Sequence, residues 1–261
     1  MAFLDMKYFS DTLRVGVSLN VILPEKAKNL IGMNTEAPST YKTLYLLHGL
    51  SDDHTTWMRR TSIERYASER GIAVVMPSVG RSWYVDTPSG GKYFSFVADE
   101  LPNVCKSYFR GMSDKKEDNF IAGLSMGGYG AIKAALCRPD VFGGCASLSG
   151  ALSFANEDDK RSMSIIADEV DWLFGKDPSP EDVKKHDVFE ITKRNHENGV
   201  SFPKMYLWCG QDDVLLYPNR RYDALLTKLD IEHTYKESEG NHSWKWWDLH
   251  IQDALDFLLK E

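Results

Sequence analysis

Hydrophobic and polar residues alternate along the first part of the chain. Residues 5–13 and 14–24 have the period of two that is typical of half-buried strands, and Pro24 ends the second run. Two antiparallel edge strands are therefore expected here. Residues 42–47 and 72–77 are instead almost continuously apolar, which predicts central strands buried on both faces.

Helical periodicity appears between and after these strands. Residues 62–70 have apolar side chains at helical spacing, and Gly71 follows them as a helix-ending residue. A second helix is expected over residues 94–109. Residues 78–91 are rich in glycine, proline and aromatic residues, so they are expected to form a loop, and we place this loop beside the functional site.

The second half of the chain repeats the alternation of strands and helices. The further elements that the pattern predicts are strands over 120–122, 141–149, 204–210 and 232–236, a helix that ends near 138, and helices over 221–229 and 246–259. Strands that alternate with helices predict an α/β protein with a mainly parallel central sheet and helices on both faces.

Residues from about 151 to 200 differ from the rest, because acidic and basic residues surround a few apolar ones and no strand pattern is evident. We expect residues 1–261 to form a single domain with a small helical cap insertion at about 151–200, over the carboxyl edge of the sheet. Charged surface helices are the alternative interpretation of this segment.

Composition and charge narrow the range of partners. The formal net charge is −7, so the chain has no electrostatic reason to bind nucleic acid or an anionic membrane. The four cysteines have no C-x-x-C spacing and are expected to be reduced core residues. No signal-peptide pattern and no apolar run of membrane-spanning length is present, so a cytoplasmic location is expected.

The chemistry centres on Gly123-Leu-Ser125-Met-Gly127, a G-x-S-x-G sequence between an apolar strand and a helix. In this setting the turn holds the serine in a strained backbone conformation and exposes its hydroxyl at the helix N-terminus. The backbone N–H groups there can stabilise an oxyanion. The pentapeptide alone fits a turn without catalytic function equally well. The presence of a base and an acid elsewhere in the chain therefore decides between the two interpretations.

A nucleophilic serine needs a base, and the base needs an acid that fixes its tautomer. In the α/β-hydrolase arrangement the chain order is nucleophile, acid, base. Two loops that follow later strands carry an acid and then a histidine, in this order. The first holds Asp212 and Asp213, and the second holds His242 within Gly-Asn-His. His242 is therefore the predicted base, while the strand-to-loop pattern leaves both aspartates open as its partner.

The loop after residues 42–47 contains His48, Gly49 and Leu50, and it could supply a second backbone N–H to an oxyanion. His48 is expected to support this turn. His54 with Asp52 and Asp53 could suggest a metal site, but no further clustered ligands accompany them, so no metal is expected.

Aromatic side chains flank the predicted catalytic loops: they are Trp57, Trp83, Tyr84, Tyr93 and Trp244. Such residues narrow a pocket and offer flat faces to a sugar or aryl group, which favours a small acyl group in the substrate. The alternative is that several of them are core residues that brace the loops.

Together, several stretches resemble the tributyrin-esterase group of the esterase D superfamily, over nearly the whole chain. The stretches are Tyr45–Trp57, Ser82–Asp86, Gly90–Tyr93, Gly123–Gly130 and Gly240–Trp244. The resemblance implies an α/β-hydrolase fold, carboxylesterase activity on short acyl chains, and no cofactor. Relatives in this superfamily include S-formylglutathione hydrolases, feruloyl and acetylxylan esterases, and mycolyltransferases.

By motif position, the resemblance implies a triad of Ser125, Asp213 and His242. The family's Cys-Gly-x-x-Asp spacing falls on Asp213 rather than on the residue before it. The backbones of Leu50 and Met126 match the family's oxyanion hole.

The function expected from these features is a serine carboxylesterase that hydrolyses acetyl to butyryl esters, with acetylated sugars among its substrates. A thioesterase similar to S-formylglutathione hydrolase, or an acyltransferase, would use the same triad. A non-catalytic binding protein on a hydrolase fold is a third, weaker hypothesis, because such a protein need not retain all these groups. The expected partner is a small-molecule ester, and the sequence leaves a homo-oligomer open.

Overall fold

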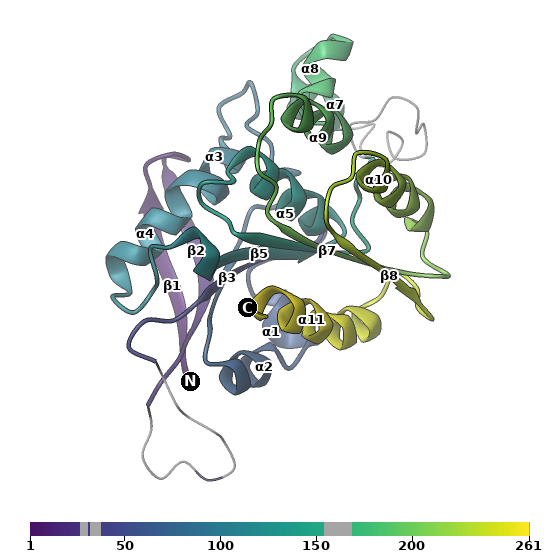
Figure 1. Ribbon diagram of the computed structural model, residues 1–261. Coiled ribbons are helices and arrows are strands. Elements are labelled where there is room, and N and C mark those ends of the chain that lie inside the picture. Colours follow the sequence, from purple (N-terminus) through teal and green to yellow (C-terminus); the bar gives the residue numbers. More distant parts are fainter. Residues whose placement is uncertain (27–30, 32–37, 154–168, 261) are drawn as a thin grey trace.

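The computed structural model describes residues 1–26, 31, 38–153 and 169–260 of the chain. Its centre is an eight-stranded sheet with the strand order β1-β2-β4-β3-β5-β6-β7-β8 (Figure 1). The strands are β1 (Ala2–Ser10), β2 (Val15–Leu23), β3 (Thr43–Leu47), β4 (Ala73–Pro77), β5 (Asn119–Leu124), β6 (Gly144–Leu148), β7 (Lys204–Gly210) and β8 (Thr234–Ser238).

Strand β2 pairs antiparallel with β1 and with β4, whereas the neighbouring pairs from β4 to β8 are parallel. The expected α/β class with a mainly parallel sheet is confirmed. The expectation of two edge strands is wrong for β2, because β2 lies between β1 and β4. Its burial reflects this place: residues 19–22 are all buried, so both faces of this part of β2 are covered, and three of the four residues are apolar.

Helices cover both faces of the sheet. They are α1 (Thr56–Arg60), α2 (Ile63–Arg70), α3 (Tyr93–Ser95), α4 (Leu101–Tyr108), α5 (Met126–Cys137), α7 (Val170–Phe174), α8 (Pro180–Lys184), α9 (Val188–Glu197), α10 (Leu216–Lys228) and α11 (Trp244–Leu259). A π-helical turn, Phe96–Glu100, joins α3 to α4, and a 3₁₀ turn, Lys116–Asp118, precedes β5. In Figure 1, α4, α5 and α10 lie on one side of the sheet, and α1, α2 and α11 lie on the other.

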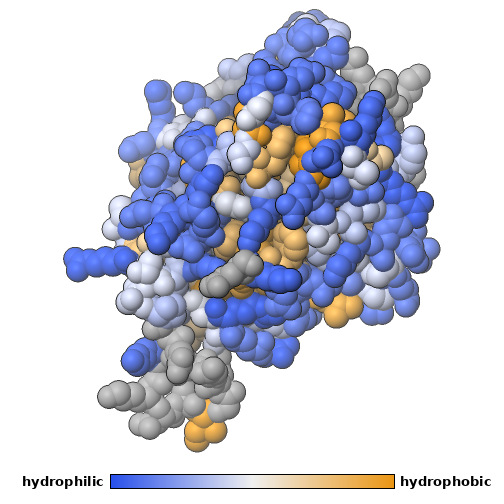
Figure 2. Space-filling model, viewed as in Figure 1, coloured by the Kyte–Doolittle hydropathy of each residue, from blue (hydrophilic) through white to orange (hydrophobic). Residues whose placement is uncertain are grey.

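Successive residues of each central strand feed two separate cores, as a strand periodicity of two requires. In β3, Tyr45 and Leu47 pack under α4, α5 and α10, whereas Leu44 and Leu46 pack against α1, α2 and α11. This explains why the central strands have continuously apolar sequences. The face seen in Figure 2 is mostly hydrophilic, with smaller hydrophobic areas between the polar side chains.

Several element boundaries differ from the expected ones. Helix α10 begins at Leu216 rather than near residue 221, and Pro218 lies in its first turn, where no intrahelical N–H bond is lost. Strand β8 is shifted by two residues relative to the expected 232–236. The short helix α1 was not predicted, since its five residues are too few to show a helical period.

The expected cap insertion at about 151–200 is described only in part, because residues 154–168 lie outside the described residues. Its described part contains α7, α8 and α9 and no strand, and α9 packs against α5. Among the described residues, no helix combines the length and the apolar composition needed to cross a membrane. The four cysteines are free thiols, and only Cys137 is not fully buried.

Candidate active site

Ser125 occupies the sharp turn between β5 and α5. Its backbone has φ 52° and ψ −118°, a combination that residues with side chains rarely adopt. The Ser125 N–H donates to the carbonyl of Leu148 at the end of β6, at 3.0 Å, and its carbonyl accepts from Tyr129 and Ala151. These bonds hold the strained turn in place.

Two glycines allow this turn to form. A Cβ added at Gly123 would lie 2.5 Å from the carbonyl carbon of Gly127, and one added at Gly127 would lie 2.5 Å from the carbonyl oxygen of Leu47. Both distances are far below van der Waals contact with backbone that cannot move aside. The G-x-S-x-G sequence is therefore required by the close approach of α5 to β5 and β3.

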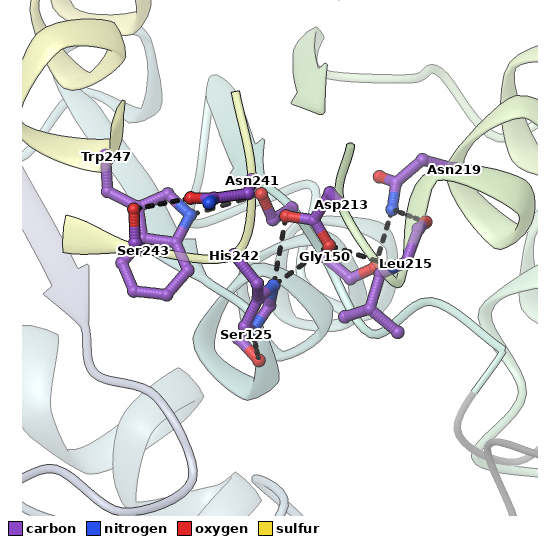
Figure 3. A network of polar contacts seen from close by, with 10 residues as sticks. Ser125, Gly150, Asp213, Leu215, Asn219, Asn241, His242, Ser243 and Trp247 are labelled. Carbon is purple, nitrogen blue, oxygen red and sulfur yellow. Dashed lines mark hydrogen bonds and ion pairs between the residues drawn. The ribbon is translucent and has the colours of Figure 1, made fainter. Parts of the chain in front are cut away.

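The structure brings the serine, the histidine and one aspartate into a single line (Figure 3). His242 Nε2 lies 3.1 Å from Ser125 Oγ, and His242 Nδ1 lies 3.0 Å from each carboxylate oxygen of Asp213. Because a carboxylate accepts, Nδ1 carries the ring proton and Nε2 is free to accept the serine proton. Asp212 is exposed, and its N–H donates to the carbonyl of Gly240.

The Asp213 side chain is completely buried, whereas 28% of the His242 side chain is exposed. Burial acts to raise the pKa of the Asp213 carboxyl. The hydrogen bond and charge of His242, the amide of Leu215 and the hydroxyl of Ser149 act in the opposite direction, and together they hold the pKa below its usual value. Asp213 is therefore ionised beside His242 and can accept a hydrogen bond from its Nδ1.

Ser149 and Trp247, which the sequence analysis did not single out, lie beside Asp213 and His242. The indole N–H of Trp247 donates to Ser149 Oγ at 3.1 Å, and the His242 ring packs against the Trp247 ring at 4.8 Å in an edge-to-face arrangement. Ser149 follows β6 with a φ of 48°. Trp247 lies in the first turns of α11, and no local motif marks either residue.

Hydrogen bonds from buried side chains fix the loop that follows β3. His48 Nε2 accepts from the N–H of Val79 at 3.0 Å, the Tyr84 hydroxyl donates to the His48 carbonyl at 3.0 Å, and the Trp57 indole donates to the Leu47 carbonyl at 3.0 Å. Burial lowers the pKa of His48, which suits its neutral, accepting Nε2. His48 thus supports the turn.

This loop carries Leu50 to the same cavity as Ser125. Met126 is the first residue of α5, so its N–H is one of those that a helix leaves without an intrahelical acceptor. The N–H of Gly49 donates to the Asp52 carboxylate, and the Asp53 carboxylate accepts from Thr55. In the part of the chain that the structure describes, no three His, Cys, Asp or Glu residues group as metal ligands would.

A cavity of about 540 Å³ opens above Ser125. Its lining residues are Gly49, Leu50, Ser51, Asp52, Trp83, Leu124, Ser125, Ala151, Val214, Leu215, His242, Ser243, Trp244 and Trp247. Most of these side chains are apolar. A cavity of this size and lining is typical of a small-molecule site.

Of the aromatic residues expected at the pocket, Trp83 and Trp244 line it. The expectation is wrong for Trp57 and Tyr84, which are 1% exposed and whose polar atoms hold the loop backbone. Tyr93 does not line the cavity either, and its ring packs near Trp172. The sequence marks aromatic residues near a site, but it does not show on which side of the loop each ring lies.

Trp83 reaches the cavity from an unusual turn. Trp83 and Tyr84 have φ angles of 50° and 49°, and the buried Lys133 of α5 donates to the Tyr84 carbonyl at 3.0 Å. Lys133 Nζ also lies 3.1 Å from His186 Nδ1. Burial lowers the pKa of Lys133 to about 8 and, with the Lys133 charge, lowers the pKa of His186 to about 2, so the imidazole is neutral and accepts.

The chain is similar in sequence to known esterases. The model of the Esterase family, described as "Putative esterase", matches residues 10–258. An acetyl esterase of Caldicellulosiruptor saccharolyticus is 32% identical over 265 residues, which cover 100% of this chain and 99% of that protein.

Two solved structures from Staphylococcus aureus are also similar. The fluorophosphonate-binding serine hydrolase FphF has a TM-score of 0.85 and 32% identity, covering 100% of this chain and 99% of that one. The S-formylglutathione hydrolase FrmB has a TM-score of 0.80 and 33% identity, and 99% of each chain is covered. These likenesses confirm the α/β-hydrolase fold.

The buried Lys133 generates a prediction about stability. Between pH 8 and pH 10.5 the unfolded chain keeps a proton on this residue that the folded chain has released, so its contribution to the free energy of unfolding rises with pH. The free energy of unfolding in urea is measured for the wild type and for Lys133→Met at each pH. The wild-type value minus the variant value should increase by up to about 3 kcal/mol from pH 8 to pH 10.5. Lys116 is exposed, so the Lys116→Met variant serves as the control. Its free energy of unfolding should differ from that of the wild type by the same amount at every pH. A flat difference for Lys133→Met would contradict the prediction.

Proposed function

Because the chain belongs to the Esterase family and is a carboxylic ester hydrolase, we propose that Ser125, His242 and Asp213 are its catalytic triad. The observation that carries the proposal is the unbroken line of hydrogen bonds from Ser125 Oγ through the imidazole to a buried carboxylate. The strained turn and the cavity above the serine support it.

In this mechanism Ser125 Oγ attacks the ester carbonyl carbon while His242 Nε2 takes the hydroxyl proton. Asp213 keeps the imidazole in the tautomer that accepts at Nε2, and it stabilises the imidazolium. The tetrahedral intermediate collapses to an acyl-enzyme, and His242 gives its proton to the departing alcohol. A water molecule, deprotonated by the same imidazole, then attacks the acyl-enzyme and releases the carboxylic acid and Ser125.

The oxyanion of the tetrahedral intermediate would be held by the backbone N–H groups of Leu50 and Met126. The dipole of α5 adds to this effect, because the helix N-terminus carries a partial positive charge beside the serine. Both amides belong to backbone that is fixed by buried contacts, so little reorganisation is needed during the reaction.

The substrate range that we propose is acetyl to butyryl esters, acetylated sugars included. The cavity of about 540 Å³ is lined by the flat rings of Trp83 and Trp244, which suits a short acyl group and a flat or cyclic alcohol. The similarity to an acetyl esterase supports this range.

A thioesterase is the second candidate, and one observation favours it. A solved S-formylglutathione hydrolase is 33% identical to this chain over almost its full length. A formyl thioester would use the same serine, histidine and aspartate, since both reactions pass through an acyl-enzyme. The two functions therefore differ in the leaving group rather than in the chemistry at Ser125.

Asparagine substitutions distinguish the two adjacent aspartates. Asp213→Asn keeps the size of a buried side chain but no longer fixes the imidazole tautomer, so kcat should fall by about 10³-fold or more. Asp212→Asn should keep nearly wild-type kcat, because Asp212 is exposed to solvent. Steady-state kinetics on p-nitrophenyl acetate measures both. The assignment is reversed if Asp212→Asn is inactive and Asp213→Asn is not.

Gly49→Val tests the loop that carries the Leu50 amide. A Cβ at Gly49 would lie 2.8 Å from Leu124 Cδ1 and 3.0 Å from Asp52 Oδ2, so the loop must shift. The kcat should fall by about 10²-fold, the scale of one lost oxyanion donor. Gly16→Val makes the same change where nothing lies within 4 Å and should leave kcat unchanged. An unaltered kcat in folded Gly49→Val protein would contradict the role of Leu50.

A series of p-nitrophenyl esters from acetate to palmitate, with S-formylglutathione beside it, tests the substrate range. The kcat/KM should be highest between acetate and butyrate, since each buried methylene adds only about 0.8 kcal/mol until the pocket is filled. Ser125→Ala should lose activity on every substrate by on the order of 10⁶-fold. A maximum at decanoate or beyond would reject the short-chain proposal, and a much higher kcat/KM on the thioester would favour the second candidate.

A further inference from the structure

Strand β1 forms one edge of the sheet. It pairs over its full length with β2 on one side, and among the described residues no strand lies on its other side. An edge of nine residues presents a row of free backbone N–H and C=O groups, which is a ready template for another strand.

One face of β1 is exposed and has an ordered pattern. Phe3 and Phe9 are 47% and 63% exposed, and between them Asp5 and Lys7 are exposed as well. Phe9 lies opposite Gly16 of β2, so no side chain of the neighbouring strand covers its ring. The other face of β1 is half-buried, with Leu4, Met6 and Tyr8 packed against the core under α4.

The order aromatic, acidic, basic, aromatic is complementary to itself. Directly opposed residues of an antiparallel pair share a face, so the exposed residues of two β1 strands must oppose one another. With a two-fold axis at Met6, Phe3 faces Phe9 of the other copy and Asp5 faces Lys7 of the other copy. All nine residues are then paired.

The neighbouring registers that keep the faces matched are worse. A shift of the axis to residue 5 places two Asp5 side chains opposite each other, and a shift to residue 7 does the same with two Lys7 side chains. Like charges directly opposed on a strand pair are destabilising. Both shifts also leave strand ends unpaired, so charge and length select the same register.

We propose that β1 is a self-association surface, on which a second copy of the chain binds through antiparallel pairing of the two β1 strands about an axis at Met6. The two eight-stranded sheets would then join into one. Asp5 and Lys7 take part in no ion pair within the described chain, so both charges are available to the second copy. The site at Ser125, after β5, is separated from this edge by β2, β4 and β3, so we expect activity to be independent of the pairing.

Charge reversal and charge exchange test this register. Sedimentation velocity of the wild type at micromolar concentration should show a species of twice the 29.7 kDa chain mass. Asp5→Lys opposes two lysines, and Lys7→Asp opposes two aspartates, so each should raise the dimer dissociation constant at least about tenfold. The double variant, Asp5→Lys with Lys7→Asp, restores opposite charges in the same register and should recover most of the wild-type affinity.

Two controls accompany these variants. The exposed Lys228 of α10 is changed to aspartate, which reverses a charge far from β1 and should leave the dimer intact. Circular dichroism and thermal unfolding show that each variant is folded, and esterase activity should be unchanged in all of them.

A monomeric wild type would overturn the proposal, because the charges of β1 would then keep strands apart, as charged residues on sheet edges commonly do. A dimer that survives both single reversals would also overturn it, since another surface would then hold the copies together. So would a double variant that stays as weak as the single ones, because the opposed pairs would not be those of this register.

Discussion

The close approach of α5 to the sheet is the contact on which the whole site depends. A Cβ at Gly127 would lie 2.5 Å from the carbonyl oxygen of Leu47 and 2.7 Å from that of His48, so the helix that follows Ser125 packs closely on the end of β3. The same contact therefore positions both the half-buried Ser125 and the loop that carries Leu50. Any side chain at Gly127 would push α5 away from the end of β3, and so would separate Ser125 from the loop that carries Leu50.

Much of this arrangement could be predicted from the sequence, for local reasons. The turn at Ser125 needs glycines at fixed positions, and strands buried on both faces, such as β3, must be apolar throughout. Both features are encoded within a few residues of one another, so a single sequence reveals them. The choice of Asp213 over Asp212 rested instead on the resemblance to a known esterase group, and the structure separates the two residues by burial.

Other parts could not be predicted, because they depend on contacts between distant segments. Trp57 and Tyr84 lie near the site in the sequence, but their rings point into the protein and their polar atoms bind backbone carbonyls of the loop after β3. Lys133 looks like a surface residue of a helix until the packing of the Tyr84 turn and His186 encloses it. No local sequence pattern distinguishes an aromatic side chain that supports the loop backbone from one that lines the cavity.

The separation of Ser125 and His242 by 117 residues has a consequence for how the protein acquires its chemistry. The β1–β2 hairpin is a local contact and can form within microseconds, whereas every parallel pair must first close a long loop. His242, the proposed base, lies after the last strand and two residues before α11 begins. The hydrogen bond to the serine is thus among the last contacts that a growing chain can make, and the proposed triad is complete only after the last strand has joined the sheet.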